Sequence, residues 1–199
     1  MMTSEINIIK EEMIKAAFRA YQLGLQTGNG GNLSCRVPAS DTIIIKGSGL
    51  SFGECRQDNF VQVTIDGEVI GGAGKPSREL LTHLSIYRLR PDIHGIFHTH
   101  SPWSIACADD SREIPLLTGH AKAKLGPVPV IRSEDQATAD FAGAVEKLLT
   151  EKPKLRAFVQ SGHGIFGLGE DITQAEHTVE LVEETSQIAF LIGLRKIKS

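Results

Sequence analysis

The chain has 199 residues, of which 41% are hydrophobic and 23% are charged, and its formal net charge is -3. This composition is ordinary for a globular protein, and the length allows one compact core, so we expect a single domain over residues 1–199. The weak negative charge and the lack of an arginine-rich run argue against a nucleic-acid partner, and no apolar run approaches the roughly 18 residues that cross a bilayer.

The elements of the N-terminal half are predicted from apolar periodicity and turn residues. In chain order they are a helix over residues 5–23, strands over 33–37 and 42–46, a hairpin over 60–72 and a helix over 75–91. The hairpin turns at Asp66-Gly67, a pair that accepts positive φ. The last helix is expected to open at Pro76 and Ser77 and to close before Pro91.

The C-terminal half alternates strands and helices. It contains a strand over residues 94–100, a strand over 128–131, a helix over 133–149, a strand–turn–strand unit over 157–169 and a helix over 171–194. Some strands are joined by hairpins and others are separated by helices. This favours an α/β fold with a mixed, mostly antiparallel sheet covered by helices over a strict parallel βαβ repeat.

The N-terminal segment and the cysteines bear on the compartment. The first 20 residues mix charged and apolar positions, which is not the pattern of a signal peptide. Cys35, Cys55 and Cys107 are odd in number and widely spaced, and no CxxC pair occurs. This favours a reducing compartment over a disulfide framework or a cysteine–zinc site, so we expect a cytoplasmic protein.

The stretch HGIFHTH, residues 94–100, holds three of the seven histidines. Side chains alternate along a strand, so His98 and His100 point to the same face, with Cα atoms roughly 7 Å apart. At that spacing both imidazoles can reach one ion at about 2.1 Å. A pair of this kind also arises by chance, with one histidine buried and the other solvated. The remaining histidines outside the candidate site are interpreted as structural or surface residues: His83, His94, His120 and His177.

Two residues elsewhere are candidate ligands beside this pair. His163 is flanked by Gly162 and Gly164, which allow a close approach, although a histidine between glycines also serves simply in a turn. Glu79 occupies the predicted first turn of the helix before the histidine strand, and a short return would bring its carboxylate near His98. A glutamate at that position is also favoured by the helix dipole, whatever its role.

Three segments rich in small residues have the character of a phosphate cradle: GNGGNLS, KGSG and KPSRE. Free N–H groups and hydroxyls on such loops bind phosphate, above all at a helix N-terminus. Each segment alone is a common turn. Together, beside a candidate metal site, they indicate a small phosphorylated substrate.

The order of these motifs resembles the class II aldolase/adducin family, from about residue 6 to residue 195. The motifs that carry the resemblance are GNGGNLS, KGSG, KPSRELLTHLSIYRLRP, HTHSP and SGHGIF. The resemblance implies a three-layer α/β/α fold with a central, mostly antiparallel mixed sheet. It also implies a homotetramer with active sites between subunits, and one zinc ion per subunit, or another divalent ion such as Mn²⁺, Co²⁺ or Fe²⁺.

The family pattern can be carried onto this chain residue by residue. It implies metal ligation by His98, His100, His163 and Glu79, and Glu79 is also the implied catalytic acid or base. The implied phosphate-binding residues are Gly31, Asn32, Ser48, Gly49, Ser77 and Arg78. Arg78 replaces the second serine of the usual PSSE motif, and a guanidinium can still bind phosphate there.

The resemblance implies a metal-dependent aldolase that reversibly cleaves a ketose 1-phosphate, similar to fuculose 1-phosphate, into dihydroxyacetone phosphate and an aldehyde through a metal-stabilised enediolate. The same parts serve a methylthioribulose-1-phosphate dehydratase, a sugar-phosphate 4-epimerase or a phospho-keto-acid decarboxylase, so these alternatives stay open. The chain departs from fuculose-phosphate aldolases, in which tyrosines donate protons. It contains only Tyr21 and Tyr87, and its C-terminal tail has no tyrosine.

Two interpretations outside this reaction group fit the sequence less well. An adducin-like interaction module on the same fold would not need a metal site, and the presence of the glutamate and all three histidines argues against it. A cupin-like metal barrel also combines an HxH pair with a distant glutamate and histidine. The long predicted helices, and a glutamate placed before the histidines, argue against a barrel.

Overall fold

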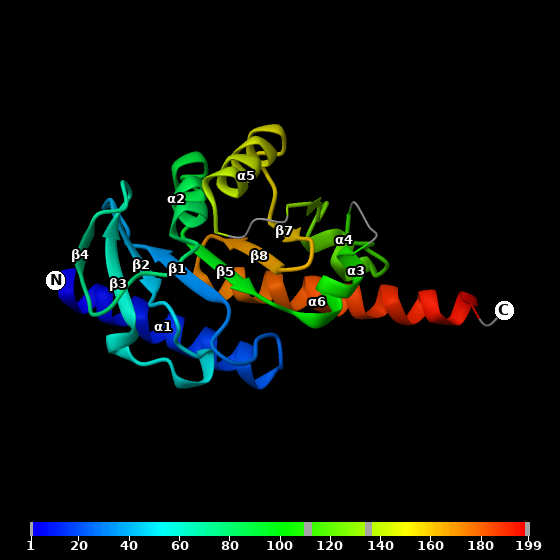
Figure 1. The fold of residues 1–199 in the computed structure, drawn as a ribbon, viewed down its shortest axis with the longest axis horizontal. Helices are drawn as coiled ribbons and strands as arrows, with labels where there is room; N and C mark the ends of the chain where they lie inside the picture. The colour runs from blue at the N-terminus through cyan, green and yellow to red at the C-terminus, as the bar shows by residue number, and fades with distance from the viewer. Residues whose placement is uncertain (1, 110–112, 134–136, 198–199) are drawn as a thin grey trace.

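One eight-stranded sheet runs through the middle of the molecule (Figure 1). The computed structural model describes residues 2–109, 113–133 and 137–197. The strands are β1 (Asn32–Arg36), β2 (Thr42–Lys46), β3 (Phe60–Thr64), β4 (Val69–Gly71), β5 (Gly95–Thr99), β6 (Val130–Ile131), β7 (Ala157–Gln160) and β8 (Gly164–Gly169). Their order across the sheet is β4-β3-β2-β1-β5-β8-β7-β6. Every neighbouring pair is antiparallel except β6 with β7, so the predicted mostly antiparallel mixed sheet is confirmed.

Helices cover both faces of the sheet. They are α1 (Met2–Gln22), α2 (Leu80–Leu89), α3 (Pro102–Ala108), α4 (Gly119–Lys124), α5 (Ala139–Glu151) and α6 (Ile172–Ile197), with short 3-10 turns η1 (Phe52–Glu54) and η2 (Gln57–Asn59). Figure 1 shows α2 and α5 together on one face and α1 and α6 on the other, which confirms the α/β/α layers. In the described ranges, no helix combines the length and the apolar character needed to span a bilayer.

The alternation of side chains along each strand divides the apolar core into two parts. On β2, Ile43 and Ile45 pack in the cluster beneath α2 and α5, whereas Ile44 packs in the cluster against α1 and α6. All three are at most 1% exposed. The run TIIIK was predicted as a strand, and burial on both faces explains why it is continuously apolar.

Two helices begin later than predicted. The helix expected from Pro76 begins at Leu80, because the preceding segment hydrogen-bonds to the chain at the end of β2: Ser77 N donates to Lys46 O over 3.1 Å. The helix expected from residue 133 begins at Ala139, and residues 134–136 lie outside the described ranges. Its N-cap is Thr138. The short helices α3 and α4 were not predicted.

Helix α6 and the residue before it, Asp171, pack closely against the sheet. A Cβ added at Gly95 on β5 would come within 2.4 Å of Asp171 O, and one added at Gly167 on β8 would come within 2.5 Å of Ala175 O. Real Cβ atoms essentially never approach a backbone oxygen this closely, so glycine at these two positions sets the distance between helix and sheet.

Candidate active site

His98 and His100 lie at the end of β5, on the same side of the strand as their spacing predicts. His98 is fully buried within the strand, while His100 follows the last strand residue and is partly exposed. Antiparallel pairing of β5 with β8 brings the turn before β8 alongside them. The His163 ring on that turn is 4.8 Å from the His98 ring and 4.6 Å from the His100 ring, between centroids.

The three histidines form one cluster of potential metal ligands. Each offers a ligand atom, and these atoms all lie within 4.8 Å of one another. His98 Nδ1 donates to Ile165 O over 2.8 Å, and His163 Nδ1 donates to Gln160 Oε1 over 2.7 Å. Nε2 of each ring therefore keeps its lone pair. This orientation by a second hydrogen bond is typical of histidines that bind metal ions.

Burial keeps these imidazoles neutral. It lowers the pKa of His98 and of His163 to about 3, with neighbouring histidines adding to the effect, and it also lowers the pKa of His100. The neutral imidazole is the form that binds a metal ion. The cluster therefore fits a divalent cation in chemistry as well as in spacing.

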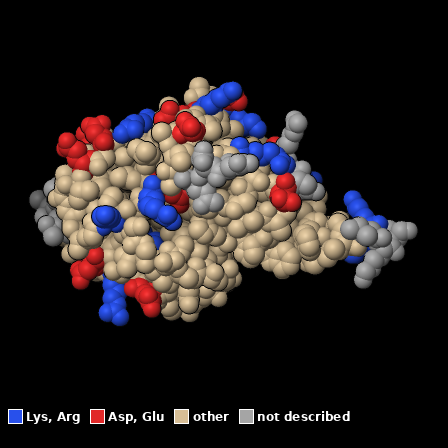
Figure 2. Space-filling model, viewed as in Figure 1, with Lys and Arg blue, Asp and Glu red and all other residues tan. Residues whose placement is uncertain are grey.

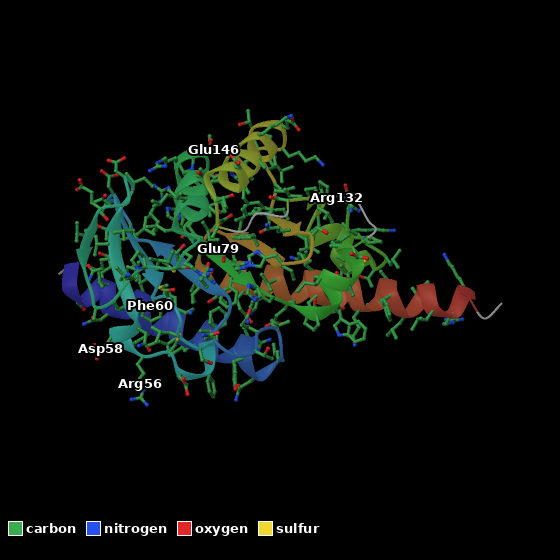
Figure 3. The ribbon with its side chains drawn as sticks, in the orientation of Figure 1. Arg56, Asp58, Phe60, Glu79, Arg132 and Glu146 are labelled. Atoms are coloured by element: carbon green, nitrogen blue, oxygen red, sulfur yellow. The ribbon has the colours of Figure 1, made fainter. Side chains whose placement is uncertain are left out.

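Glu79 reaches the same point from the N-cap position of α2, not from the first turn as predicted. Its Oε2 is 3.2 Å from His98 Nε2 and its Oε1 is 3.8 Å from His163 Nδ1. Both His98 Nε2 and Glu79 Oε1 are buried and have no hydrogen-bond partner in the described part of the chain. Because His98 is neutral, a lone pair faces a carboxylate here, and a bound cation would satisfy both. Figure 3 shows Glu79 in the middle of the molecule, near the start of α2.

Asn32 holds the Glu79 carboxylate. Its side-chain amide donates to Glu79 Oε2 over 2.5 Å, and in the sheet it lies opposite His98. Burial raises the pKa of Glu79, while His163 and the Asn32 hydrogen bond act against that effect. The structure thus brings a predicted phosphate-loop residue into contact with the predicted acid or base.

The other predicted phosphate segments lie side by side. Ser48 N donates to Lys75 O over 2.9 Å and Ser77 N donates to Lys46 O, so these two N–H groups are used within the chain. Neither of these two N–H groups is therefore available to a bound anion. The Ser77 hydroxyl accepts a 3.3 Å hydrogen bond from Glu79 N and can still donate its own proton. The Ser48 hydroxyl also remains, as do the N–H groups of Gly49 and Arg78, which make no hydrogen bond with the described residues.

These segments enclose a cavity of about 130 Å³, adjoined by an open cleft of about 640 Å³. Every predicted site residue except His98 lines the cavity. The lining residues are Asn29, Gly30, Gly31, Asn32, Lys46, Gly47, Ser48, Gly49, Ser77, Arg78, Glu79, His100, Ala137 and His163. Arg78 also lines the outer cleft, so its exposed side chain lies at the mouth of the cavity.

Lys46 and Gln26 are among the residues in or beside this site that were not predicted as site residues. Lys46 is 1% exposed, lines the cavity, and donates to Leu50 O; burial lowers its pKa to about 8. Gln26 is 2% exposed and accepts a 2.7 Å hydrogen bond from His100 N, which ties the glycine-rich loop to the end of β5. Both residues stand next to the glycines of the predicted loops, Lys46 at the start of KGSG and Gln26 at the start of QTGNGGN, and this position could have identified them.

The tyrosines do not line the cavity. Tyr21 is 44% exposed on α1, and Tyr87 is 1% exposed on α2, where its hydroxyl contacts Ser34. Among the described residues of one chain, Glu79 is the only carboxylate that lines the cavity.

Sequence comparison gives relatives along nearly the whole chain. The family described as Class II Aldolase and Adducin N-terminal domain matches residues 11–190. The chain is 31% identical over 195 residues to 3-oxo-tetronate 4-phosphate decarboxylase of Escherichia coli (strain K12), covering 96% of this chain and 90% of that protein. It is 30% identical over 197 residues to L-ribulose-5-phosphate 4-epimerase UlaF of Salmonella paratyphi C (strain RKS4594), covering 92% and 84%.

Solved structures of similar fold indicate the same family. YgbL from Escherichia coli superposes with a TM-score of 0.86 at 29% identity, covering 94% of this chain and 90% of that one. An L-fuculose 1-phosphate aldolase superposes with a TM-score of 0.85 at 28% identity, covering 93% and 86%. With these matches added to its fold and histidine cluster, the chain belongs to the class II aldolase and adducin family.

Proposed function

We propose that this chain is a divalent-metal-dependent lyase that removes CO₂ from a small phosphorylated 3-keto sugar acid and releases dihydroxyacetone phosphate. The observation that carries the proposal is a cavity whose described lining holds one carboxylate, Glu79, beside three neutral histidines and next to hydroxyl and cationic groups suited to phosphate. The similarity to a 3-oxo-tetronate 4-phosphate decarboxylase supports the substrate class.

The substrate phosphate would bind at the end of the cavity formed by residues 46–49 and 77–78. The Ser48 and Ser77 hydroxyls are donors there, together with the Gly49 N–H, which makes no hydrogen bond to the described part of the chain, and Lys46 and Arg78 contribute positive charge. Hydrogen bonds to a charged acceptor are stronger than neutral ones, which suits a doubly charged phosphate. The keto group would then extend toward the histidines.

The proton balance favours decarboxylation. When the bond between C1 and C2 breaks, C1 leaves as CO₂ and the electron pair becomes an enediolate over C2 and C3. One proton must then reach C2, and Glu79 is the group placed to deliver it and to regain it from water. A divalent ion bound by His98, His100 and His163 would supply Lewis acidity to the keto oxygen.

Aldol cleavage of a ketose 1-phosphate gives the same enediolate but needs two proton transfers. One proton leaves the hydroxyl that becomes the aldehyde, and another reaches the carbon of the enediolate. Only one carboxylate lines the cavity in the described chain, and neither tyrosine does. The likeness to an L-fuculose 1-phosphate aldolase structure still makes this cleavage the second candidate.

A single assay separates the two. The metal-loaded protein is incubated with 3-oxo-tetronate 4-phosphate and, in parallel, with fuculose 1-phosphate, and CO₂, dihydroxyacetone phosphate and aldehyde are each measured. Equal amounts of CO₂ and dihydroxyacetone phosphate from the keto acid support the proposal. Dihydroxyacetone phosphate with aldehyde and no CO₂ would assign an aldolase, and no dihydroxyacetone phosphate from either compound would reject both.

Zinc is the proposed ion, because three neutral histidines leave room for a fourth, exchangeable ligand in a tetrahedral site. The purified protein should contain one equivalent of zinc per chain by elemental analysis. His100→Asn should lower that content, whereas His94→Asn, on a half-buried histidine outside the cluster, should not. Equal zinc in both variants would remove the histidine cluster as the metal site.

A homotetramer with shared active sites is proposed for the assembly. The end of α6 projects from the body (Figure 1) and carries few charged side chains before its tip (Figure 2). Its exposed apolar residues are Phe190, Leu191, Ile192 and Leu194. Apolar side chains gathered in this way are typical of subunit interfaces. Light scattering that gives the mass of one chain would reject the assembly.

A further inference from the structure

Three residues of β1 face the N-cap of α2 and two residues of the helix itself, at matched spacing. The pairs are Asn32 with Glu79, Ser34 with His83, and Arg36 with Tyr87. Two residues along a strand advance roughly 6.6 Å and four residues along a helix advance roughly 6 Å, so the pairs stay in step. The first pair lies at the active site, and the other two lie progressively farther along the helix.

The middle pair is a buried polar cluster. Ser34 Oγ lies 2.6 Å from His83 Nδ1 and 2.9 Å from Tyr87 Oη. The three residues are at most 1% exposed. Arg36 extends the cluster, because it donates to Tyr87 O and its guanidinium carbon lies 5.1 Å from the centre of the Tyr87 ring. The strand therefore holds Tyr87 at both its hydroxyl and its backbone.

Hydrogen bonds control the position of a helix more sharply than apolar packing does. An apolar contact tolerates small sliding movements, whereas a hydrogen bond weakens steeply outside a narrow range of distance and angle. A slide of α2 along β1 would leave Ser34, His83 and Tyr87 desolvated and without partners. The cluster thus favours one axial position of the helix.

Glu79 depends on that position. It is the N-cap of α2, its own side chain makes no capping hydrogen bond, and its carboxylate accepts a hydrogen bond from the side chain of Asn32. The neighbouring ring of Phe166 connects the two regions as well, since it lies 6.2 Å from the His83 ring and stacks on the His98 ring at 4.1 Å, between centroids.

We propose that Ser34, His83 and Tyr87 are positioning residues that set where the Glu79 carboxylate meets His98 and His163. The inference rests on the proposed role of Glu79 in the reaction. None of the three lines the cavity, so they act through the helix and not on the substrate.

The test uses the full-length, metal-loaded protein with Tyr87→Phe and Ser34→Ala. Displacement of a reacting group by about 1 Å costs on the order of a hundredfold in rate, so kcat should fall ten- to a hundredfold. KM should change by no more than about twofold, because the phosphate segments are untouched. The dissociation constant for Co²⁺ should rise, because the carboxylate moves away from the histidines.

His83 allows a rescue experiment. His83→Leu removes the partner of Ser34 and should lose activity, whereas the side-chain amide of His83→Asn can take the place of Nδ1 and should restore part of kcat. Equal activity in the two variants would contradict the inference, because packing alone would then suffice.

Thr185→Val is the matched control. Thr185 is fully buried and its hydroxyl donates to Pro115 O over 3.1 Å on another part of the molecule. It should lower the melting temperature about as much as Tyr87→Phe does, with no fall in kcat. A fall in kcat of equal size in Thr185→Val, or full activity in folded Ser34→Ala, would overturn the proposal.

The positioning role can be tested even if the wild-type protein proves inactive on the proposed substrates. The Co²⁺ dissociation constant and a crystal structure of Ser34→Ala then decide. A weaker Co²⁺ site and a displaced Glu79 support the positioning role even though the proposed reaction has failed. An unchanged constant with Glu79 in place overturns it.

Discussion

The side-chain amide of Asn32 donates a 2.5 Å hydrogen bond to Oε2 of Glu79. Asn32 lies on β1 opposite His98, so the strand beside the histidine strand also holds the carboxylate. Strand pairing and the Asn32 side chain together thus fix the proposed acid or base relative to a candidate metal ligand.

Replacing Glu79 by glutamine tests its role as a proton carrier. Glu79→Gln keeps the shape of the side chain but cannot carry a proton, so kcat should fall roughly 10²–10⁴-fold while the fold and most of the bound metal remain. Steady-state kinetics and elemental analysis measure this. Glu68→Gln, at an exposed position on the β3–β4 hairpin, is the control and should behave as wild type. Near-normal turnover in Glu79→Gln would leave Glu79 as a ligand at most.

A negative charge in the phosphate cradle should weaken substrate binding. Ser48→Asp, at an exposed position, and Ser77→Asp, at a buried one, should both raise KM for the phosphorylated substrate at least tenfold, because like charges repel at close range. Thr150→Asp adds the same charge at the exposed end of α5 and should leave KM unchanged. If KM is also unchanged in Ser48→Asp, the phosphate does not bind at this end of the cavity.

Alanine substitutions at two glycines of one loop can distinguish the cost of a strained backbone from the cost of a steric clash. Gly28 and Gly31 have φ of 60° and 65°, but an added Cβ at Gly28 meets open space, whereas one at Gly31 comes within 2.8 Å of His98 O. Alanine at either position should cost about 1–2 kcal/mol of unfolding free energy from the left-handed backbone. Only Gly31→Ala should also weaken metal binding, as measured by Co²⁺ titration. Equal metal affinity in the two variants would contradict the contact argument.

Glu176 should make stability depend on pH. Its side chain is 1% exposed, and burial, followed by the nearby Glu180 carboxylate, raises its pKa well above the usual range, with Arg19 acting weakly against this. Between the ordinary and the raised pKa the folded state holds a proton that the unfolded state has lost, so stability falls as pH rises through that window. Glutamine cannot ionise, so Glu176→Gln removes this loss of stability at higher pH. Its melting temperature relative to wild type should therefore rise from pH 5 to pH 8.

The exposed neighbour Glu184 provides the control for that experiment, since Glu184→Gln should show the same difference at both pH values. The opposite trend in Glu176→Gln, with a growing loss of stability toward pH 8, would mean that the Glu176 carboxylate is ionised and stabilised by Arg19.

The histidine pair is the part of the site that simple geometry predicts. Alternation along HGIFHTH places His98 and His100 on one side, and the structure agrees. The arrival of His163 depends on pairing between β5 and β8, segments more than 60 residues apart, and no local pattern specifies that pairing. The flanking glycines made His163 a candidate, and the order of the motifs implied its place beside the pair, because the resemblance carries information about tertiary arrangement.

The start of α2 shows where local rules fail. Pro76 and Ser77 are good residues for opening a helix, so the sequence favours a start there. In the structure Ser77 N bonds to Lys46 O, a contact between segments 31 residues apart in sequence. That contact keeps the backbone out of the helix, joins two of the predicted phosphate segments and leaves Glu79 at the N-cap. A long-range hydrogen bond of this kind outweighs a local preference and is not visible in the local sequence.

The closeness of α6 to the sheet affects how a complete mutational scan of this protein should be interpreted. Gly95 and Gly167 should tolerate almost no substitution, because any side chain would collide with the backbone of the helix. Neither residue lines the cavity, so their intolerance would reflect the spacing of two layers and not chemistry. A scan scored by growth alone would rank them with Glu79. A scan scored by both protein abundance and turnover would separate them, because Gly95 and Gly167 variants should be lost at the abundance stage.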